Sequence, residues 1–279
     1  MQFTKMHGLG NDFVVVEAFA GLPSTKDLSA LAKQVCRRHF GVGADGLVFL
    51  LPSEVADFRM HMYNADGSLA EMCGNALRCV SKYVYEHGLC HWPDITVETL
   101  DGIKQVQLEL EGNQVTQVKV DMGFPVLDPA RIPMLTLTNP PIAVPVEVQG
   151  QRYAVTGVST GVPHAITFVP DVKRIDLANV GPCLERHQVF PRGTNVEFVQ
   201  VINANRVLVR VWERGAGITQ ACGTGACAVV VACVLNGLTE EAVDVELPGG
   251  ILKIHWQNRQ RIYMIGPATE VFTGEWPLN

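Results

Sequence analysis

The sequence has no long basic run and no long hydrophobic run, and each absence argues against a class of protein. Lys and Arg number 22 against 28 Asp and Glu, so the formal net charge is -6 and a phosphate-backbone partner is not expected. The longest apolar stretch, Ala226 to Leu235, is too short to span a bilayer. The beginning of the chain lacks the charged, apolar and small-residue order of an export signal. We therefore expect a cytoplasmic protein with neither nucleic acid nor membrane as a partner.

The cysteines lack the spacing of a zinc site. Cys73 and Cys79 are six residues apart, and Cys222 and Cys227 five apart, whereas zinc ligands commonly stand as C-x-x-C pairs. The glycine-rich "CGTGAC" has no following Lys-Ser or Lys-Thr, so it is not a phosphate-binding loop. Eight cysteines diluted over 279 residues favour reduced thiols over a disulfide framework. We expect no metal.

What the chain does contain is an internal repeat at an offset of 149 residues. This shift places Phe49 on Phe198, Tyr63 on Trp212, Asn64 on Glu213 and Cys73 on Cys222. A duplicated unit fixes the architecture, so we expect two similar domains related by a pseudo-two-fold axis. A proline-rich stretch after Phe124 separates them. The expected domains are residues 1–120, with 267–279 returning to this domain, and residues 121–266.

Matching secondary-structure signals surround the two repeated cysteines. The segments "DFRMHMYN" and "RVLVRVWE" alternate in the manner of half-buried strands. Proline-free helical segments then follow each cysteine and end at Gly88 and Gly237, which are suitable C-terminal caps. The second is apolar on nearly every face and is therefore expected to be buried. The fold class predicted is α+β, with a mixed sheet or barrel around a central helix in each domain.

The two repeats also match more loosely at "HGLGNDFVVVE" and "STGVPHAITFV", and this match includes two candidate site residues. It places Asn11 and His164 before corresponding strands.

A cysteine at a helix start has a chemical use. The first N-H groups of a helix lack internal partners and the helix dipole adds positive charge there, so the pKa of a thiol should fall toward neutrality. Glycine directly after Cys73 and Cys222 opens the helix start to a carboxylate. One sulfur could take an α-proton while the other returns a proton to the opposite face. Such an inversion implies no pyridoxal phosphate and no metal. The remaining cysteines are expected to be buried hydrophobic residues: Cys36, Cys79, Cys90, Cys183, Cys227 and Cys233.

Six motifs, in order along nearly the whole chain, resemble diaminopimelate epimerases: "MHGLGNDF", "YNADGS", "EMCGN", "WERGAG", "ACGTGAC" and "ELPGG". Proline racemases share the two-cysteine design, but their first cysteine typically precedes Gly-His, whereas Asn75 follows Gly74 here. The resemblance implies two barrels, each around a helix, and a small-molecule substrate. It also implies a homodimeric, cofactor-independent isomerase that interconverts LL- and meso-diaminopimelate for lysine and peptidoglycan synthesis.

The resemblance also implies roles for individual residues. Cys73 and Cys222 correspond to the acid/base pair, and His164 and Glu213 to residues flanking the thiols. The backbone N-H groups of Gly74, Asn75, Gly223 and Thr224 correspond to the site of the reacting carboxylate. Asn11, Asn64, Asn195 and Arg214 correspond to substrate contacts, and the planar guanidinium suits a distal carboxylate.

Structural roles remain as alternatives for several of these residues. Asn64 and Asn195 could be turn residues that bond their own backbone, Arg214 a solvated charge, and His164 a satisfied core histidine. A carboxylate at Glu213 would be costly unless it is paired or functional.

Two positions depart from the family pattern. Val162 and Ile218 stand where relatives often carry asparagine and glutamate, and Ser159 or Thr160 could replace the asparagine contact. Two other functions therefore stay open: a two-cysteine racemase for another amino acid, of histidine or proline type, and a non-catalytic thiol redox or binding protein.

Overall fold

The computed structural model describes residues 1–24 and 27–278 and divides into two compact units. The first comprises Met1–Asp121 and the C-terminal segment from Ile265, and the second Met122–Met264. From the sequence, the divisions are expected at residues 120 and 266. The structure places them inside two strands, Gln114–Gly123 (β8) and Arg261–Gly266 (β17). No helix in the described part of the chain is long and apolar enough to cross a bilayer.

The first unit is a sheet with two helices. Its strands are Gln2–Gly8 (β1), Asn11–Glu17 (β2), Gly46–Leu51 (β3), Phe58–Asn64 (β4), Leu69–Ala70 (β5), Asp94–Thr99 (β6), Gly102–Glu111 (β7), β8 and Thr269–Glu275 (β18). Its helices are Leu28–Cys36 (α1) and Gly74–Glu86 (α2). The C-terminal strand β18 pairs with β1, so the end of the chain completes the unit in which the chain begins.

The second unit contains the same kinds of element, in the same order except that its edge strand β9 comes first, whereas β18 comes last in the chain. Its strands are Val144–Val148 (β9), Gln151–Ser159 (β10), Pro163–Phe168 (β11), Asn195–Asn203 (β12), Arg206–Glu213 (β13), Gly217–Ile218 (β14), Ala242–Leu247 (β15), Gly250–Gln257 (β16) and β17. Its α-helices are Leu177–Glu185 (α3) and Gly223–Leu235 (α4), and Val172–Arg174 forms a 3-10 turn (η1).

The strand pairing repeats between the units. The first follows the order β18-β1-β2-β3-β4-β6-β7-β8, and the second β9-β10-β11-β12-β13-β15-β16. In the first unit β2 runs parallel to β3, and β4 parallel to β6. In the second unit the corresponding pairs, β11 with β12 and β13 with β15, are also parallel. The short strands β5 and β14 attach to β4 and β13. The predicted α+β class and the duplication are therefore confirmed.

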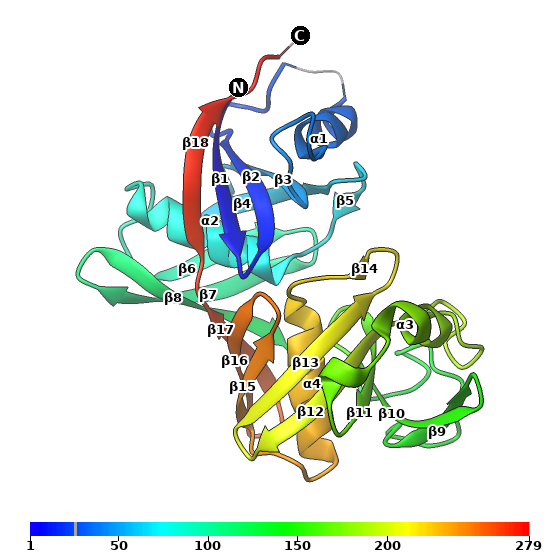
Figure 1. Ribbon diagram of the computed structural model, residues 1–279. Helices are drawn as coiled ribbons and strands as arrows, with labels where there is room; N and C mark the ends of the chain where they lie inside the picture. Colours follow the sequence, from blue (N-terminus) through cyan, green and yellow to red (C-terminus); the bar gives the residue numbers. More distant parts are fainter. Residues whose placement is uncertain (25–26, 279) are drawn as a thin grey trace. The chain divides into compact units, whose positions relative to one another are not determined.

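In each unit a central helix packs against the strands of the sheet (Figure 1). Helix α4 contacts β10, β11, β12, β15 and β16 and is buried along almost its whole length, as its uniform apolarity predicted. Helix α2 contacts β1, β2, β7 and β18 and is more amphipathic. Both end just before a glycine in the left-handed region, Gly88 at φ 71° and Gly237 at φ 69°, which confirms the predicted caps.

Candidate active site

Cys73 is the N-cap residue of α2. Its backbone is extended (φ -144°, ψ 112°), and its carbonyl accepts the first helical bond from Leu77 N at 2.9 Å. Asn11 reaches this point because Leu9 and Gly10, both at positive φ, make the two-residue turn that joins β1 to β2. Asn11 Oδ1 accepts from Asn75 Nδ2 at 2.9 Å and lies 3.9 Å from Cys73 Sγ. The structure thus brings Cys73, Gly74, Asn11 and Asn75 together at one helix start.

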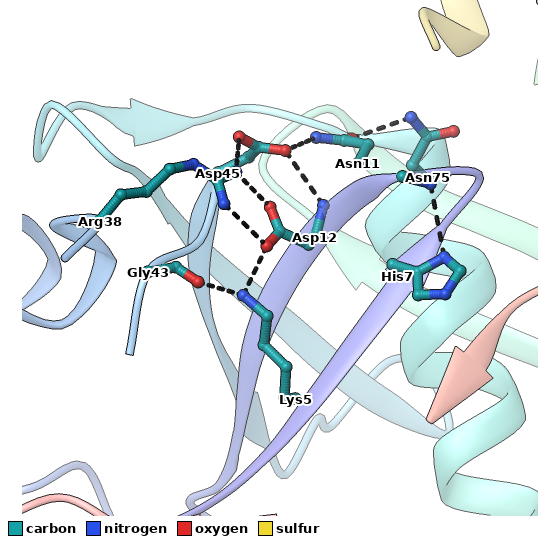
Figure 2. Close-up of polar contacts among 9 residues, drawn as sticks. Lys5, His7, Asn11, Asp12, Arg38, Gly43, Asp45 and Asn75 are labelled. Carbon is teal, nitrogen blue, oxygen red and sulfur yellow. Dashed lines mark hydrogen bonds and ion pairs between the residues drawn. The ribbon is translucent and has the colours of Figure 1, made fainter. Parts of the chain in front are cut away.

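A charged network behind Asn11 fixes its amide (Figure 2). Asp45 Oδ2 accepts from Asn11 Nδ2 at 2.7 Å and from Asp12 N at 3.0 Å. Arg38 donates to both carboxylates, and Lys5 Nζ lies 2.6 Å from Asp12. Burial alone would raise the pKa of Asp12, but hydrogen bonds from Arg38 and Lys5 outweigh it and the pKa is lowered. Because Asp45 holds the Asn11 amide nitrogen, the amide oxygen is directed to Asn75 and Cys73.

The buried side chain of Arg78 holds the side-chain amide of Asn75. Arg78 Nη1 donates to Asn75 Oδ1 at 2.9 Å, and its Nε donates to Pro267 O at 3.2 Å. A Cβ atom at Gly8 would lie 2.7 Å from Arg78 Nη2, so glycine in the motif "MHGLG" makes room for the guanidinium. These contacts leave the Asn75 amide with a single orientation, because its oxygen faces Arg78 and its nitrogen faces Asn11.

Cys222 is the N-cap residue of α4, with an extended backbone (φ -120°, ψ 110°). Its sulfur accepts from Gly225 N at 3.3 Å and lies 3.5 Å from Thr224 Oγ1. Thr160 Oγ1 donates to Thr224 O at 2.9 Å, which fastens the first turn of the helix. The predicted position of both cysteines at a helix start is confirmed.

The predicted lowering of the thiol pKa is wrong for Cys222. Its pKa is raised well above the ordinary value, first by burial and then by the charges of Glu213 and Glu197. Hydrogen bonds from Thr224 and Gly225 N lower it, but they do not compensate. The residue is only 5% exposed. Burial and two nearby carboxylates therefore favour the thiol form of Cys222, despite its place at a helix start.

Glu213 lies at the end of β13, beside Cys222. Burial raises the pKa of its carboxyl group, and hydrogen bonds from Thr219 and Cys222, with the nearby His164, lower it in part. Thr219 Oγ1 donates to Glu213 Oε1. The structure thus groups Glu213, Cys222, Gly223 and Thr224 as the sequence predicted.

His164 has a partner that the sequence analysis missed. Its Nδ1 lies 2.6 Å from Glu197 Oε1, and both side chains are fully buried. The loose match of Asn11 to His164 needs a correction. Pairing of β11 with β12 puts His164 opposite Asn195, as pairing of β2 with β3 puts Phe13 opposite Gly46. Since Gly46 and Asn195 are 149 residues apart, His164 corresponds to Phe13, and Asn11 to Val162.

The polar side chains expected to bind substrate are mostly engaged in local contacts. Asn195 Nδ2 donates to Pro163 O at 3.1 Å, and its Oδ1 accepts from Arg214 N at 2.8 Å. Asn64 Nδ2 donates to Ser68 Oγ at 2.9 Å within the "NADGS" turn. The exposed Arg214 donates one N-H to Arg192 O, out of five that a guanidinium carries. Asn195 therefore orients the backbone at Arg214.

Two positions that depart from the family pattern differ in exposure. Ile218 is half exposed, and Val162 is partly buried. The structure has Ser159 buried at the end of β10 and Thr160 bonded to Thr224.

Of the cysteines expected in the core, Cys183 is partly exposed. It accepts from Gln149 Nε2 at 3.4 Å. Within the described ranges, no three His, Cys, Asp or Glu side chains come together as a metal site.

Comparison with known proteins identifies the family. The diaminopimelate epimerase family model matches residues 3–127 and 156–271. The chain is 52% identical to the diaminopimelate epimerase of Desulfovibrio desulfuricans over 99% of this chain and 98% of that protein. It is 51% identical to that of Methanococcus maripaludis over 99% of both.

Solved structures with the same fold are more distant in sequence. A probable proline racemase from Agrobacterium radiobacter has a TM-score of 0.73 at 15% identity, covering 100% of this chain and 93% of that chain. A Bacillus anthracis protein of the PhzF family has a TM-score of 0.73 at 17% identity, covering 100% and 99%. With half of its residues identical to diaminopimelate epimerases along nearly its full length, the chain belongs to the diaminopimelate epimerase family.

Proposed function

We propose that this chain interconverts LL- and meso-diaminopimelate by a two-base transfer of the α-proton, with Cys73 and Cys222 as the bases. Full-length relatedness to diaminopimelate epimerases is the observation that carries the proposal. A cysteine at the N-cap position of each of two equivalent helices supports the mechanism. Both sulfurs are proposed to act on one α-carbon from opposite sides.

The proton balance is simple. One cysteine, as a thiolate, removes the α-proton and becomes a thiol. The electron pair left on carbon is delocalised into the α-carboxylate, and the other thiol gives its proton to the opposite face and becomes a thiolate. Since Cys222 is held as a thiol by burial and two carboxylates, we assign it the donor role in the resting enzyme and Cys73 the acceptor role. Product release leaves the roles exchanged, and solvent protons restore them.

The α-carboxylate is proposed to bind the first N-H groups of the two helices, at Gly74, Asn75, Gly223 and Thr224. These groups lack intrahelical acceptors and point along the positive end of the helix dipole. They stabilise the negative charge that develops as the α-proton leaves, without a pyridoxal cofactor. Glu213, hydrogen-bonded to Cys222 with a raised pKa, is proposed to exchange protons with that thiol, and His164 serves as the second flanking acid/base group.

Substrate recognition away from the reacting carbon is assigned to Asn11, Asn64, Asn195 and Arg214. Arg214 offers N-H groups beyond the one bound to Arg192 O, in a planar arrangement suited to a distal carboxylate. Asn195 contributes by holding the Arg214 backbone.

The wider setting proposed is the cytoplasm and lysine and peptidoglycan synthesis, without nucleic acid or membrane partners. A homodimer is also proposed, because β18 is exposed along nearly its whole length and presents Val271 and Phe272 at the edge of a sheet. Sedimentation equilibrium at micromolar concentration tests it, and a monomer would refute it.

Proton NMR of LL-diaminopimelate with the reduced protein in deuterium oxide tests the reaction. Loss of the α-proton signal together with growth of the meso isomer is the expected result. Exchange with no meso product would refute the two-base step. Activity on histidine or proline, with none on diaminopimelate, would establish a racemase of different specificity. Absence of exchange with any amino acid would favour a redox or binding role.

A further inference from the structure

The second unit contains a buried ionisable pair that is missing from the first. His164 in β11 and Glu197 in β12 are fully buried, with Nδ1 and Oε1 2.6 Å apart. Among the described residues, His164 Nε2 and Glu197 Oε2 have no hydrogen-bond partner. Burying such groups is costly, because water no longer solvates them. A pair retained in this setting needs an explanation beyond packing.

The first unit has the same fold, so its equivalent residues show whether the fold itself requires a buried histidine and glutamate. By strand register, His164 corresponds to Phe13, and the offset of 149 residues places Glu197 on Val48. Phe13 and Val48 are fully buried and apolar. The same fold therefore closes over an apolar pair in the first unit, so the fold itself does not require the histidine and the glutamate.

A third difference accompanies these two. Gly225, in the first turn of α4, corresponds to Ala76 in α2. A Cβ atom at Gly225 would lie 2.6 Å from Glu197 Oε1 and 3.1 Å from Cys222 Sγ. The glutamate carboxylate thus approaches the start of α4 more closely than alanine would permit. Three substitutions between the units therefore serve one arrangement, in which the carboxylate reaches both His164 and the helix that carries Cys222.

We propose that Glu197 is a positioning residue for His164: it accepts the Nδ1 proton and so leaves Nε2 as the nitrogen that takes up and returns a proton during epimerisation. The inference rests on the proposed function for its role in turnover. The Nδ1 proton stays on the ring throughout. When Nε2 takes up a proton from the nearby Glu213 and Cys222, the imidazolium that forms is paired with the Glu197 carboxylate. When Nε2 returns the proton to them, the neutral ring regains its original tautomer.

The tautomer can be measured without any substrate. Nitrogen-15 NMR of protein labelled in the imidazole rings reports which nitrogen bears hydrogen, and the spectrum of His164→Gln assigns the signal among the eight histidines. We expect His164 to carry hydrogen on Nδ1 and none on Nε2. In Glu197→Val this preference should be lost, whereas Glu197→Gln should retain it through an amide oxygen. A wild-type ring protonated on Nε2 alone would overturn the proposal.

Kinetics then test the role in turnover. Glu197→Val should lower kcat about 100-fold, at the lower end for loss of acid/base assistance, with KM changed less than about threefold. The matched control is Glu185→Gln, which alters another buried carboxylate of the second unit, one that accepts from Trp212 Nε1 at 2.7 Å. It should leave kcat unchanged. A kcat for Glu197→Val within twofold of wild type would refute the role.

The double variant His164→Phe with Glu197→Val guards against a folding artefact, because it recreates the apolar pair of the first unit. It should fold, and its kcat should equal that of His164→Phe alone, since Glu197 acts through the histidine. A further loss in the double variant would mean that Glu197 acts independently. If the wild-type chain does not epimerise diaminopimelate, the proposed function fails, while the NMR measurement still decides whether Glu197 sets the tautomer.

Discussion

The two units place a cysteine at the same point of the same fold and surround it differently. In the first, Cys73 Sγ lies 3.9 Å from the amide oxygen of Asn11, which also accepts from Asn75 Nδ2. In the second, Cys222 is buried and faces the carboxylates of Glu213 and Glu197. The backbone repeat provides two equivalent helix starts. Strand residues that differ between the units then make the two thiols chemically unequal.

The difference between the two thiols suits a reaction in which one sulfur accepts a proton and the other donates one. A two-base mechanism needs one protonated and one deprotonated sulfur at the start. Two identical environments would populate the two singly protonated states equally, with either sulfur as the thiolate. The carboxylates beside Cys222 favour the thiol there, so they bias the pair toward one productive starting state.

The largest effect is expected when either sulfur is removed. Cys73→Ser and Cys222→Ser should each lower kcat by about 1,000-fold or more, since loss of a positioned acid or base costs about 100- to 10,000-fold. Ligand binding, followed by calorimetry, should remain measurable in both. Although the environments differ, the losses should be similar, because the proposed mechanism uses both sulfurs in each turnover.

The control for these variants is Cys183→Ser, at a partly exposed thiol that accepts from Gln149. It should behave as wild type. If Cys73→Ser kept full α-proton exchange, the two-base mechanism would be wrong.

A second effect is expected when the residue of one unit is placed at the equivalent position of the other, as Gly225→Ala or as Ala76→Gly. Gly225→Ala forces the first turn of α4 away from Glu197 Oε1 and Cys222 Sγ, and a displacement of about 1 Å at reacting groups can cost about 100-fold in rate. Ala76→Gly, the reverse change in the first unit, should only destabilise the fold by about 1 kcal/mol. Steady-state kinetics and urea unfolding of both variants test this. Equal effects on kcat would remove the distinction between the two helix starts.

A third, smaller effect concerns thiol reactivity. Iodoacetamide at neutral pH should modify Cys73 about 10-fold faster than Cys222, because the thiolate is the nucleophile and burial with two carboxylates raises the pKa of Cys222. Glu213→Gln removes one of those charges and should accelerate modification of Cys222. Mass spectrometry of the peptides measures both rates. Equal rates in the wild-type protein would contradict the proposed resting state.

The features predictable from the sequence are those encoded locally. Cys73 and Cys222 stand directly before proline-free helical segments, and Gly88 and Gly237 end them, so both helix starts could be placed. The duplication and the strand alternation then fixed the fold class. The helix-start argument alone predicts a lowered thiol pKa, but burial and then carboxylates from β12 and β13 raise the pKa of Cys222 instead. Spatial neighbours from separate strands were needed to correct it.

Glu197 shows what a closer comparison of the repeats could have found. It lies in the run Val196-Glu197-Phe198-Val199, where apolar residues surround it, and the offset of 149 places it on Val48. An ionisable residue within a buried strand is costly, so the mismatch with Val48 was a readable signal. The register of His164 was harder to read, because "HGLGNDF" and "STGVPHA" share only one glycine in the correct alignment, Gly10 with Gly161. Strand pairing decides that match.

The smallest effect on turnover is expected in the charged network of the first unit, where Asp12 corresponds in register to Pro163. Asp12→Asn should change kcat only a few-fold. It removes the charged partner of Lys5, which is 7% exposed and also donates to Gly43 O, and should cost about 3 kcal/mol of unfolding free energy at pH 7. The pKa of Asp12 is lowered in the folded protein. Its contribution is therefore complete above the unfolded value of about 3.9 and is lost as the pH falls through the lower folded value. Urea unfolding should show that the difference in unfolding free energy between wild type and Asp12→Asn shrinks below about pH 4.

The control is Asp66→Asn, at an exposed carboxylate whose pKa is lowered by Ser68. It should have little effect on stability at any pH. A constant difference for Asp12→Asn down to pH 2.5 would mean that the network is held by packing rather than by charge.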